Sequence, residues 1–207
     1  MSLDRVRITA PTVWPMFRRS VPVDHAPADP VTACALAAAA GDRAALDEFV
    51  RATQAGVRQF LIHLAGPADA DDLVQETYLR AVRSLPRFTG DGPARAWLLA
   101  IARRAAADAV RTAVRRPRTT NVGDWDAVTA RGARVSAVDE AVLVGELVAG
   151  LEPDRRDAFV LTQVVGLGYA EAAQVCGCPV GTIRSRVSRA REDLVAALEP
   201  GDARASG

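Results

Sequence analysis

The chain contains no lysine, so all 26 basic residues among its 207 are arginines. Codon bias in a GC-rich genome is the simplest cause of this usage. Its chemical consequence still matters, because arginine presents a planar fork that contacts phosphate and guanine in ways that lysine cannot. The net charge is only +1, so overall charge predicts no nucleic-acid partner, and the distribution of the arginines has to be followed along the chain.

Cysteine and histidine are also scarce. The three cysteines are an odd, sparse set without a secretion signal, which favours a reduced, cytoplasmic protein. Cys176 and Cys178 form a Cys-x-Cys pair, but Cys34 and both histidines lie far away in the sequence. Because structural zinc needs four ligands, we expect the pair to pack as small apolar thiols, and we expect no metal and no cofactor.

Long apolar runs and aromatic residues are missing as well. The longest apolar run, Ala33–Ala40, is far too short to cross a bilayer, so we expect no contact with a membrane. Aromatic residues make up 5% of the chain, alanine is abundant, and no segment alternates as a strand would. The sequence therefore predicts an all-α protein.

Residues 1–30 differ from the rest because they contain five prolines and show no helical period. We interpret them as a flexible N-terminal extension, and the apolar cluster from Trp14 to Phe17 leaves a short partner-binding motif as the alternative. From Val31 to Leu64, apolar residues recur at three- and four-residue steps with a break at Gly41-Asp42. This period predicts helices with one buried face.

Two further helices are predicted in the first half of the chain. One runs from Ala70 to Leu85, with Asp69 and Asp71 as N-cap candidates and Pro86 as its end. Its expected buried stripe consists of Leu73, Thr77, Ala81 and Leu85. The next runs from Pro93 to Arg116 and is the most basic part of the chain. Its expected core residues are Trp97, Leu98, Ile101, Ala105 and Val110.

The second half begins with a predicted linker, residues 118–138, that lacks an apolar period. Helices are expected again from Asp139 to Leu151 and from Arg155 to Val165. Gly166 and Gly168 end the second of these.

The segment from Gly168 to Leu194 reads GYAEAAQVCGCPVGTIRSRVSRAREDL. It predicts a short helix, a tight turn at Gly177, and a second helix opened by Pro179. The second helix has an expected buried stripe of Val180, Ile183, Val187, Ala190 and Leu194. Its opposite side carries Arg184, Ser185, Ser188, Arg189 and Glu192, with Arg186 and Arg191 at the flanks. This pattern predicts a helix-turn-helix that binds duplex DNA, and the alternative is a solvated amphipathic helix with an arginine face.

These segments resemble the extracytoplasmic-function (ECF) sigma factors of bacterial RNA polymerase, and in particular an actinobacterial sigma-C-like branch. CGCPVGTIRSRVSRAR is similar to the domain 4 helix-turn-helix, DADDLVQETYLRAVRSLPRF to the polymerase-binding helix of domain 2, and ARAWLLAIARRAAADAVR to the adjoining promoter-melting segment. The resemblance implies two small helical domains, at residues 31–117 and 139–198, joined by a flexible linker and followed by a tail at 199–207.

The resemblance also implies roles for individual residues. Contacts to the clamp of the largest polymerase subunit fall on Asp72, Gln75, Glu76 and Arg80. Contacts to the −10 element fall on Phe88, Arg95, Arg103, Arg104, Asp108 and Arg111. Contacts to the −35 element fall on Thr182, Arg184, Ser185, Arg186, Ser188, Arg189 and Arg191. Many family members carry asparagine where this chain has Arg104, which puts the usual −10 base preference in question.

The function implied is that of a sigma factor, which binds core RNA polymerase through its clamp and flap region and directs it to promoter DNA. An anti-sigma factor is a further partner that the family suggests, and no intrinsic catalysis is expected. One alternative is a stand-alone helix-turn-helix repressor or activator, which would not explain the acidic helix followed by an arginine-rich one. A DNA-cutting enzyme such as a resolvase would need a domain with strands, and no strand pattern is present.

Overall fold

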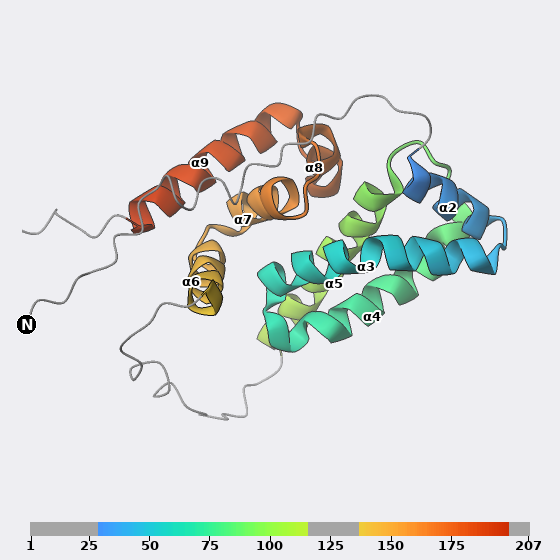
Figure 1. Cartoon of the computed structure of the whole chain (residues 1–207), viewed down its shortest axis with the longest axis horizontal. Helices are drawn as coiled ribbons and strands as arrows, with labels where there is room; N and C mark the ends of the chain where they lie inside the picture. The colour runs from blue at the N-terminus through green and yellow to red at the C-terminus, as the bar shows by residue number, and fades with distance from the viewer. Residues whose placement is uncertain (1–28, 116–136, 199–207) are drawn as a thin grey trace, which may run out of the picture.

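The computed structural model describes residues 29–115 and 137–198, and every regular element in these two ranges is helical (Figure 1). This confirms the predicted all-α class. The first half contains α2 (Pro30–Ala39), α3 (Arg43–Ala65), α4 (Pro67–Ser84), the 3-10 turn η2 (Leu85–Arg87) and α5 (Ala94–Arg115). The second half contains α6 (Ala137–Ala149), α7 (Pro153–Phe159), the π-helical turn η3 (Val160–Val164), α8 (Tyr169–Cys176) and α9 (Val180–Leu198).

Three predicted segments lie largely or wholly outside the described residues. They are the N-terminal extension up to residue 28, the linker up to residue 136, and the tail from residue 199.

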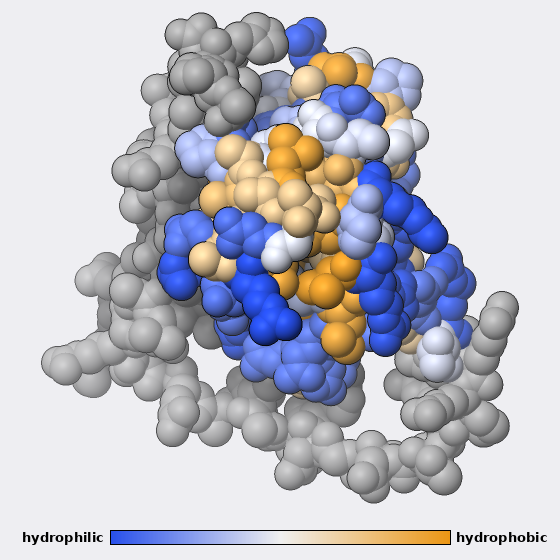
Figure 2. Space-filling model, turned by 90° about the vertical axis from the view of Figure 1, so that its right-hand side faces the viewer, coloured by the Kyte–Doolittle hydropathy of each residue, from blue (hydrophilic) through white to orange (hydrophobic). Residues whose placement is uncertain are grey.

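The break between α2 and α3 lies where the sequence predicts it. Asp42 is the N-cap of α3, and its carboxylate accepts hydrogen bonds from the backbone N–H groups of Ala44 and Ala45 at 2.9 and 3.1 Å. These bonds satisfy amide donors that the first turn of a helix leaves without partners. On the outer side of α2, Leu36 is 41% exposed. Apolar residues gather in the centre of this end of the molecule, with charged residues around them (Figure 2).

The start of α4 differs from the prediction. The helix begins at Pro67, and its N-cap is Gly66, which has a φ of 89° and provides no side-chain cap. The prediction of Asp69 and Asp71 as N-cap candidates was therefore wrong. Proline is suited to the first helical position because its φ is already helical and its missing N–H is not needed there. Asp69 lies within the first turn, where its negative charge interacts favourably with the positive end of the helix dipole.

The first half has a core between α3, α4 and α5. The predicted stripe on α4 is confirmed, since Leu73, Thr77, Ala81 and Leu85 are all buried. They lie in one cluster with Phe49, Phe60 and Leu61 of α3 and with Leu98 and Ala102 of α5. The prediction that Val110 belongs to this core was wrong, because Val110 is 54% exposed. The buried face of α5 ends at Ala106, so Val110 lies one turn beyond it.

The second half contains the predicted helix-turn-helix. Gly177 joins α8 to α9 with a φ of 65°, a left-handed conformation that glycine adopts without steric cost. Ile183, Val187 and Ala190 of α9 are buried as predicted, and Leu194 packs against the same cluster. Val180 was predicted to be buried and is exposed, because it is the first residue of α9 and precedes the packed turns.

One helix predicted in the second half is divided. The segment predicted as a single helix from Arg155 to Val165 is an α-helix to Phe159 followed by the π-helical turn η3. In η3, the N–H of Val165 donates to the carbonyl of Val160 at 2.9 Å.

The two halves pack against each other along α5 and α8. The α3 helix also contacts α6, α7 and η3, and the buried residues of both halves form one cluster. This arrangement brings the arginine-rich helix of the first half against the helix-turn-helix of the second.

Candidate nucleic-acid interface

The outer face of α9 presents the side chains predicted to read bases. Arg184, Ser185, Ser188 and Arg189 are all exposed on the side opposite the buried stripe. Within the described ranges, neither Arg184 nor Arg189 forms an ion pair, so both guanidinium groups remain available to a ligand. The hydroxyl of Ser185 donates to the carbonyl of Thr182 at 2.9 Å, which keeps this short side chain close to the helix. A helix of this kind fits the width of the major groove.

The two flanking arginines of α9 have intramolecular partners. Arg186 is paired with Asp154 of α7 and also donates to the Cys178 sulfur at 3.6 Å. Arg191 Nη2 donates to Gln163 Oε1 of η3 at 2.7 Å. These contacts brace α9 against the preceding elements, so Arg186 and Arg191 have a structural role in this conformation.

An ion-pair cluster joins the two halves of the molecule. Arg103 Nε of α5 lies 2.5 Å from Asp157 Oδ2, and its Nη2 lies 3.5 Å from Asp154 Oδ1. Asp154 therefore lies between Arg103 and Arg186. Burial raises the pKa of Asp157, and the hydrogen bond from Arg103 opposes that rise. The arginine thus offsets part of the cost of burying this carboxylate.

The Cys-x-Cys pair borders this cluster. Burial raises the pKa of the Cys176 thiol to about 12, so the thiol stays protonated at neutral pH. Among the residues that the structure describes, no group of three or more histidine, cysteine or acidic side chains is placed to hold a metal ion.

A pocket of about 230 Å³ lies between the loop after η2 and the start of α5. Phe88 and Trp97 line it, and their ring centroids are 5.0 Å apart at an interplanar angle of 42°. Asp91 also borders the pocket and accepts a hydrogen bond from Thr89 at 2.5 Å. Gln174 of α8 contributes to the lining, so the second half of the chain reaches this pocket.

The remaining residues predicted for the −10 element occupy different positions. Arg104 is exposed, and its Nε donates to the carbonyl of Ala100 at 3.0 Å. Arg95 lines a small cavity together with Gly56 of α3 and Val165 of the second half. Arg111 is exposed near the end of α5 and pairs with Asp108. The structure therefore does not gather the six predicted residues on a single face.

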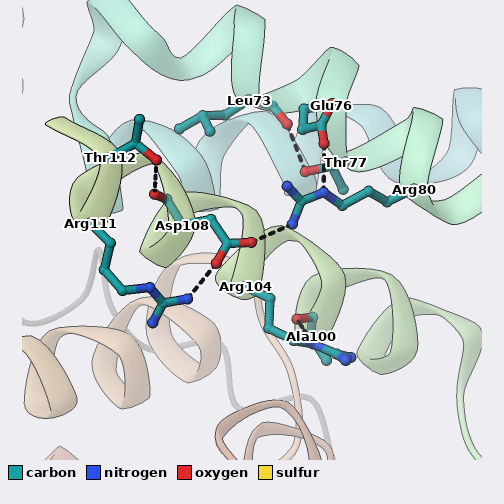
Figure 3. A network of polar contacts seen from close by, with 9 residues as sticks. All are labelled: Leu73, Glu76, Thr77, Arg80, Ala100, Arg104, Asp108, Arg111 and Thr112. Atoms are coloured by element: carbon teal, nitrogen blue, oxygen red, sulfur yellow. Dashed lines mark hydrogen bonds and ion pairs between the residues drawn. The ribbon is translucent and has the colours of Figure 1, made fainter. Parts of the chain in front are cut away.

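The exposed side of α4 carries the residues predicted to bind polymerase. Asp72 and Gln75 are exposed, and Glu76 Oε1 accepts a hydrogen bond from Arg80 Nε at 2.6 Å. Arg80 also reaches across to α5, where its Nη1 lies 2.7 Å from Asp108 Oδ2 (Figure 3). Of the four predicted residues, Asp72 and Gln75 are thus open to solvent, while Glu76 and Arg80 belong to a polar network.

Two apolar residues on this side of α4 were missed by the sequence reasoning. Leu79 and Val82 are 53% and 46% exposed. Together with Asp72 and Gln75 they follow a 3-4-3 spacing, which places all four along one seam of the helix. The sequence does indicate their exposure, because Leu79 and Val82 are apolar residues that lie outside the buried stripe of the same helix.

The family comparisons agree with this geometry. Residues 49–116 match Sigma-70 region 2, and residues 141–194 match Sigma-70, region 4. Over 172 residues the chain is 49% identical to the ECF RNA polymerase sigma factor SigC of Mycobacterium tuberculosis, a match that covers 83% of this chain and 93% of that protein. The chain belongs to the ECF sigma factors. The ECF RNA polymerase sigma-E factor of Escherichia coli is 33% identical over 174 residues, 77% of this sigma factor and 90% of that protein.

Two solved structures are also similar to this sigma factor. CnrH, in complex with the cytosolic domain of CnrY, has a TM-score of 0.65 and 29% identity over 82% of this chain and 97% of that one. The sigma factor RpoE from Bartonella quintana, in complex with the anti-sigma factor NepR, has a TM-score of 0.59 and 29% identity over 74% of this chain and 96% of that one.

The family assigns the function. As a sigma factor, the protein binds core RNA polymerase and directs it to promoters, and the alternative of a stand-alone repressor or activator is not favoured. Sigma factors are not a family of enzymes. Within the described ranges, none of the helices combines the length and apolar character that a membrane span requires.

Proposed function

We propose that this sigma factor reads the −35 element with the outer face of α9. The guanidinium groups of Arg184 and Arg189 carry this assignment, because they are exposed and have no ion pair among the residues that the structure describes. An arginine fork in this state can bond two acceptors on one guanine. Ser185 and Ser188 are short enough to let the helix approach the base edges. Thr182 lies at the start of α9, where helix N-termini and hydroxyl groups contact phosphate.

The polymerase-binding surface is the seam of Asp72, Gln75, Leu79 and Val82 on α4. Exposed apolar residues at helical spacing are suited to packing against a helix of a partner, and the flanking polar residues set its orientation. Glu76 and Arg80 support this seam through the bond between them.

The −10 surface centres on the pocket beside Phe88 and Trp97. Its volume and aromatic lining suit one extruded base, and binding of extruded bases offsets the unstacking cost of a few kcal/mol per base. Arg104 is placed on α5 to contact a phosphate near it, since its Nε bonds to the carbonyl of Ala100, which lines the pocket. Arg111 lies farther along, near the end of the helix. Arg95 and Arg103 face the second half of the chain, so they reach DNA only after the two halves separate.

Once the two halves separate, polymerase has to hold the two DNA-binding domains at the spacing of the promoter elements. Residues 31–117 form the domain that binds polymerase and the −10 element, and residues 139–198 form the −35 domain, joined by residues 118–138. Each domain is small, so its affinity for DNA alone is low. A polymerase that holds the two domains at the promoter spacing raises the effective concentration of the second contact.

The proposal also covers the cellular location, the chemistry and the partners of the protein. It acts in the cytoplasm, without catalysis of its own and without a cofactor. An anti-sigma factor is a candidate partner, because the similar RpoE of Bartonella quintana is found in complex with NepR.

The test is to mix the full chain with core RNA polymerase and measure promoter-dependent transcription on genomic fragments. We expect a stable complex with core and new start sites that share two sequence elements at fixed spacing. Failure to bind core, or start sites unchanged by the added protein, would contradict the proposal.

A further inference from the structure

Asp108 lies between two arginines on the side of α5 that faces α4 (Figure 3). One carboxylate oxygen, Oδ2, accepts a hydrogen bond from Arg80 Nη1 at 2.7 Å, and the other, Oδ1, is paired with Arg111 Nη2. Both oxygens of the carboxylate are therefore engaged by guanidinium groups of the chain itself.

The network around Asp108 is electrically neutral. It contains the carboxylates of Glu76 and Asp108 and the guanidinium groups of Arg80 and Arg111. The hydrogen bonds from Arg80 and then from Arg111 hold the pKa of Asp108 below its ordinary value, so its carboxylate is ionised at neutral pH. A carboxylate that faced the DNA would repel phosphate, whereas this one faces two cations.

Arg104 provides the contrast on the same helix. It is exposed one turn before Asp108, its Nε donates to a backbone carbonyl, and it has no ion pair in the part of the chain that the structure describes. On the helix that faces DNA in the proposed function, Arg104 thus keeps its full charge, whereas Arg111 is neutralised by a neighbouring acid.

We propose that Asp108 is a positioning residue that acts on DNA through Arg111. Because Asp108 holds the Arg111 guanidinium, the end of α5 offers less positive charge to DNA phosphates. Non-specific contacts with DNA are then confined to the segment of α5 near the pocket lined by Phe88 and Trp97. Arg80 keeps Asp108 in place from α4. The inference rests on the proposed function, in which α5 faces the promoter.

The test measures binding of the holoenzyme to a non-specific DNA duplex at several salt concentrations. Each phosphate that a protein neutralises adds about 0.9 to the steepness of log K against log salt. We expect Asp108→Asn to make the dependence steeper by about 0.9 and to raise the affinity at low salt by a few-fold. The matched control is Asp47→Asn, which makes the same charge change at an exposed position on α3 and should leave the dependence unchanged.

A second pair of variants identifies the group through which Asp108 acts. Arg111→Gln alone should change the salt dependence by much less than about 0.9, because Asp108 already restrains Arg111. The double variant Asp108→Asn/Arg111→Gln should return the dependence to that of the unaltered protein. Three results would overturn the proposal. They are a steeper salt dependence that persists in the double variant, a decrease of about 0.9 in the steepness for Arg111→Gln alone, and weaker DNA binding by Asp108→Asn.

The affinity of these variants for core polymerase is measured alongside. It should match that of the unaltered protein, since the proposal places Asp108 outside the seam on α4. If the unaltered protein itself fails to bind core, the proposed function fails, and this result is distinct from any change in salt dependence among the variants.

Discussion

Arg103 and Asp157 are 54 residues apart in the chain, and their side chains meet at 2.5 Å where α5 packs against the second half. The Asp157 side chain is only 11% exposed, so the pair lies within the contact between the halves. Removing one partner of such a pair leaves the other charge partly buried without compensation.

Asp157→Asn should therefore lower the free energy of unfolding by roughly 1–3 kcal/mol, less than for a fully buried pair because Arg103 retains some exposure. Urea denaturation of the full chain measures this change. As a control, Glu48→Gln removes the exposed pair with Arg51 and should cost no more than about 0.5 kcal/mol. Equal losses in the two variants would contradict a stabilising role for the Arg103–Asp157 pair.

The double variant Arg184→Ala/Arg189→Ala should lose discrimination at the −35 element. A bidentate arginine contact to guanine contributes about 1–3 kcal/mol of base discrimination, so promoters with altered −35 bases should become nearly equivalent. Transcription from a promoter set with single −35 changes measures this effect. Core binding should persist, and its loss would mean that the assignment of the two domains is wrong.

Arg186 should behave differently from Arg184, although both are on α9. Arg186→Gln removes the contacts to Asp154 and Cys178 and should lower stability by about 1 kcal/mol. Arg184→Gln removes an exposed side chain and should leave stability within about 0.5 kcal/mol. Thermal melting of the two variants distinguishes these outcomes, and identical melting curves would show that the Arg186 contacts contribute nothing to stability.

Leu79→Ser combined with Val82→Ser should weaken core binding by about tenfold or more. Burying the exposed half of two such side chains against polymerase contributes on the order of 1 kcal/mol each. Titration of labelled core polymerase measures the affinity. Leu36→Ser removes a similarly exposed apolar residue from α2 and should leave core affinity unchanged. Equal effects of the double variant and the control would argue against the seam on α4.

Acidification should destabilise the contact between α3 and α7 through His63. Burial, and then the positive charge of Arg156, lowers the pKa of His63 below 6.5. A histidine with a lowered pKa contributes stability that is present above its unfolded pKa and is lost as the pH falls through its folded pKa. The melting temperature should therefore decrease when the pH is lowered below about 6.5. His63→Gln should remove much of this dependence, and an unchanged pH profile would contradict the role of His63.

Much of this protein is determined by its sequence because the relevant signals are local. The period of three and four residues places Leu73, Thr77 and Ala81 on one buried face. Glycine at position 177 permits the left-handed turn of the helix-turn-helix, and arginines opposite the apolar stripe of α9 must face outward. The fold class, the helix-turn-helix and the exposed outer face of α9 all follow from such patterns.

Only the tertiary structure decides how the charged side chains are partnered. Arg80 of α4 pairs with Asp108 of α5, and Arg103 of α5 pairs with Asp157 of α7, whereas Arg104 on the same helix as Arg103 stays exposed. Partners far apart in the sequence meet only when α5 packs against α4 and the second half of the chain. Helical spacing determines the direction in which a side chain leaves its own helix, and it carries no information about which charge of another helix lies opposite.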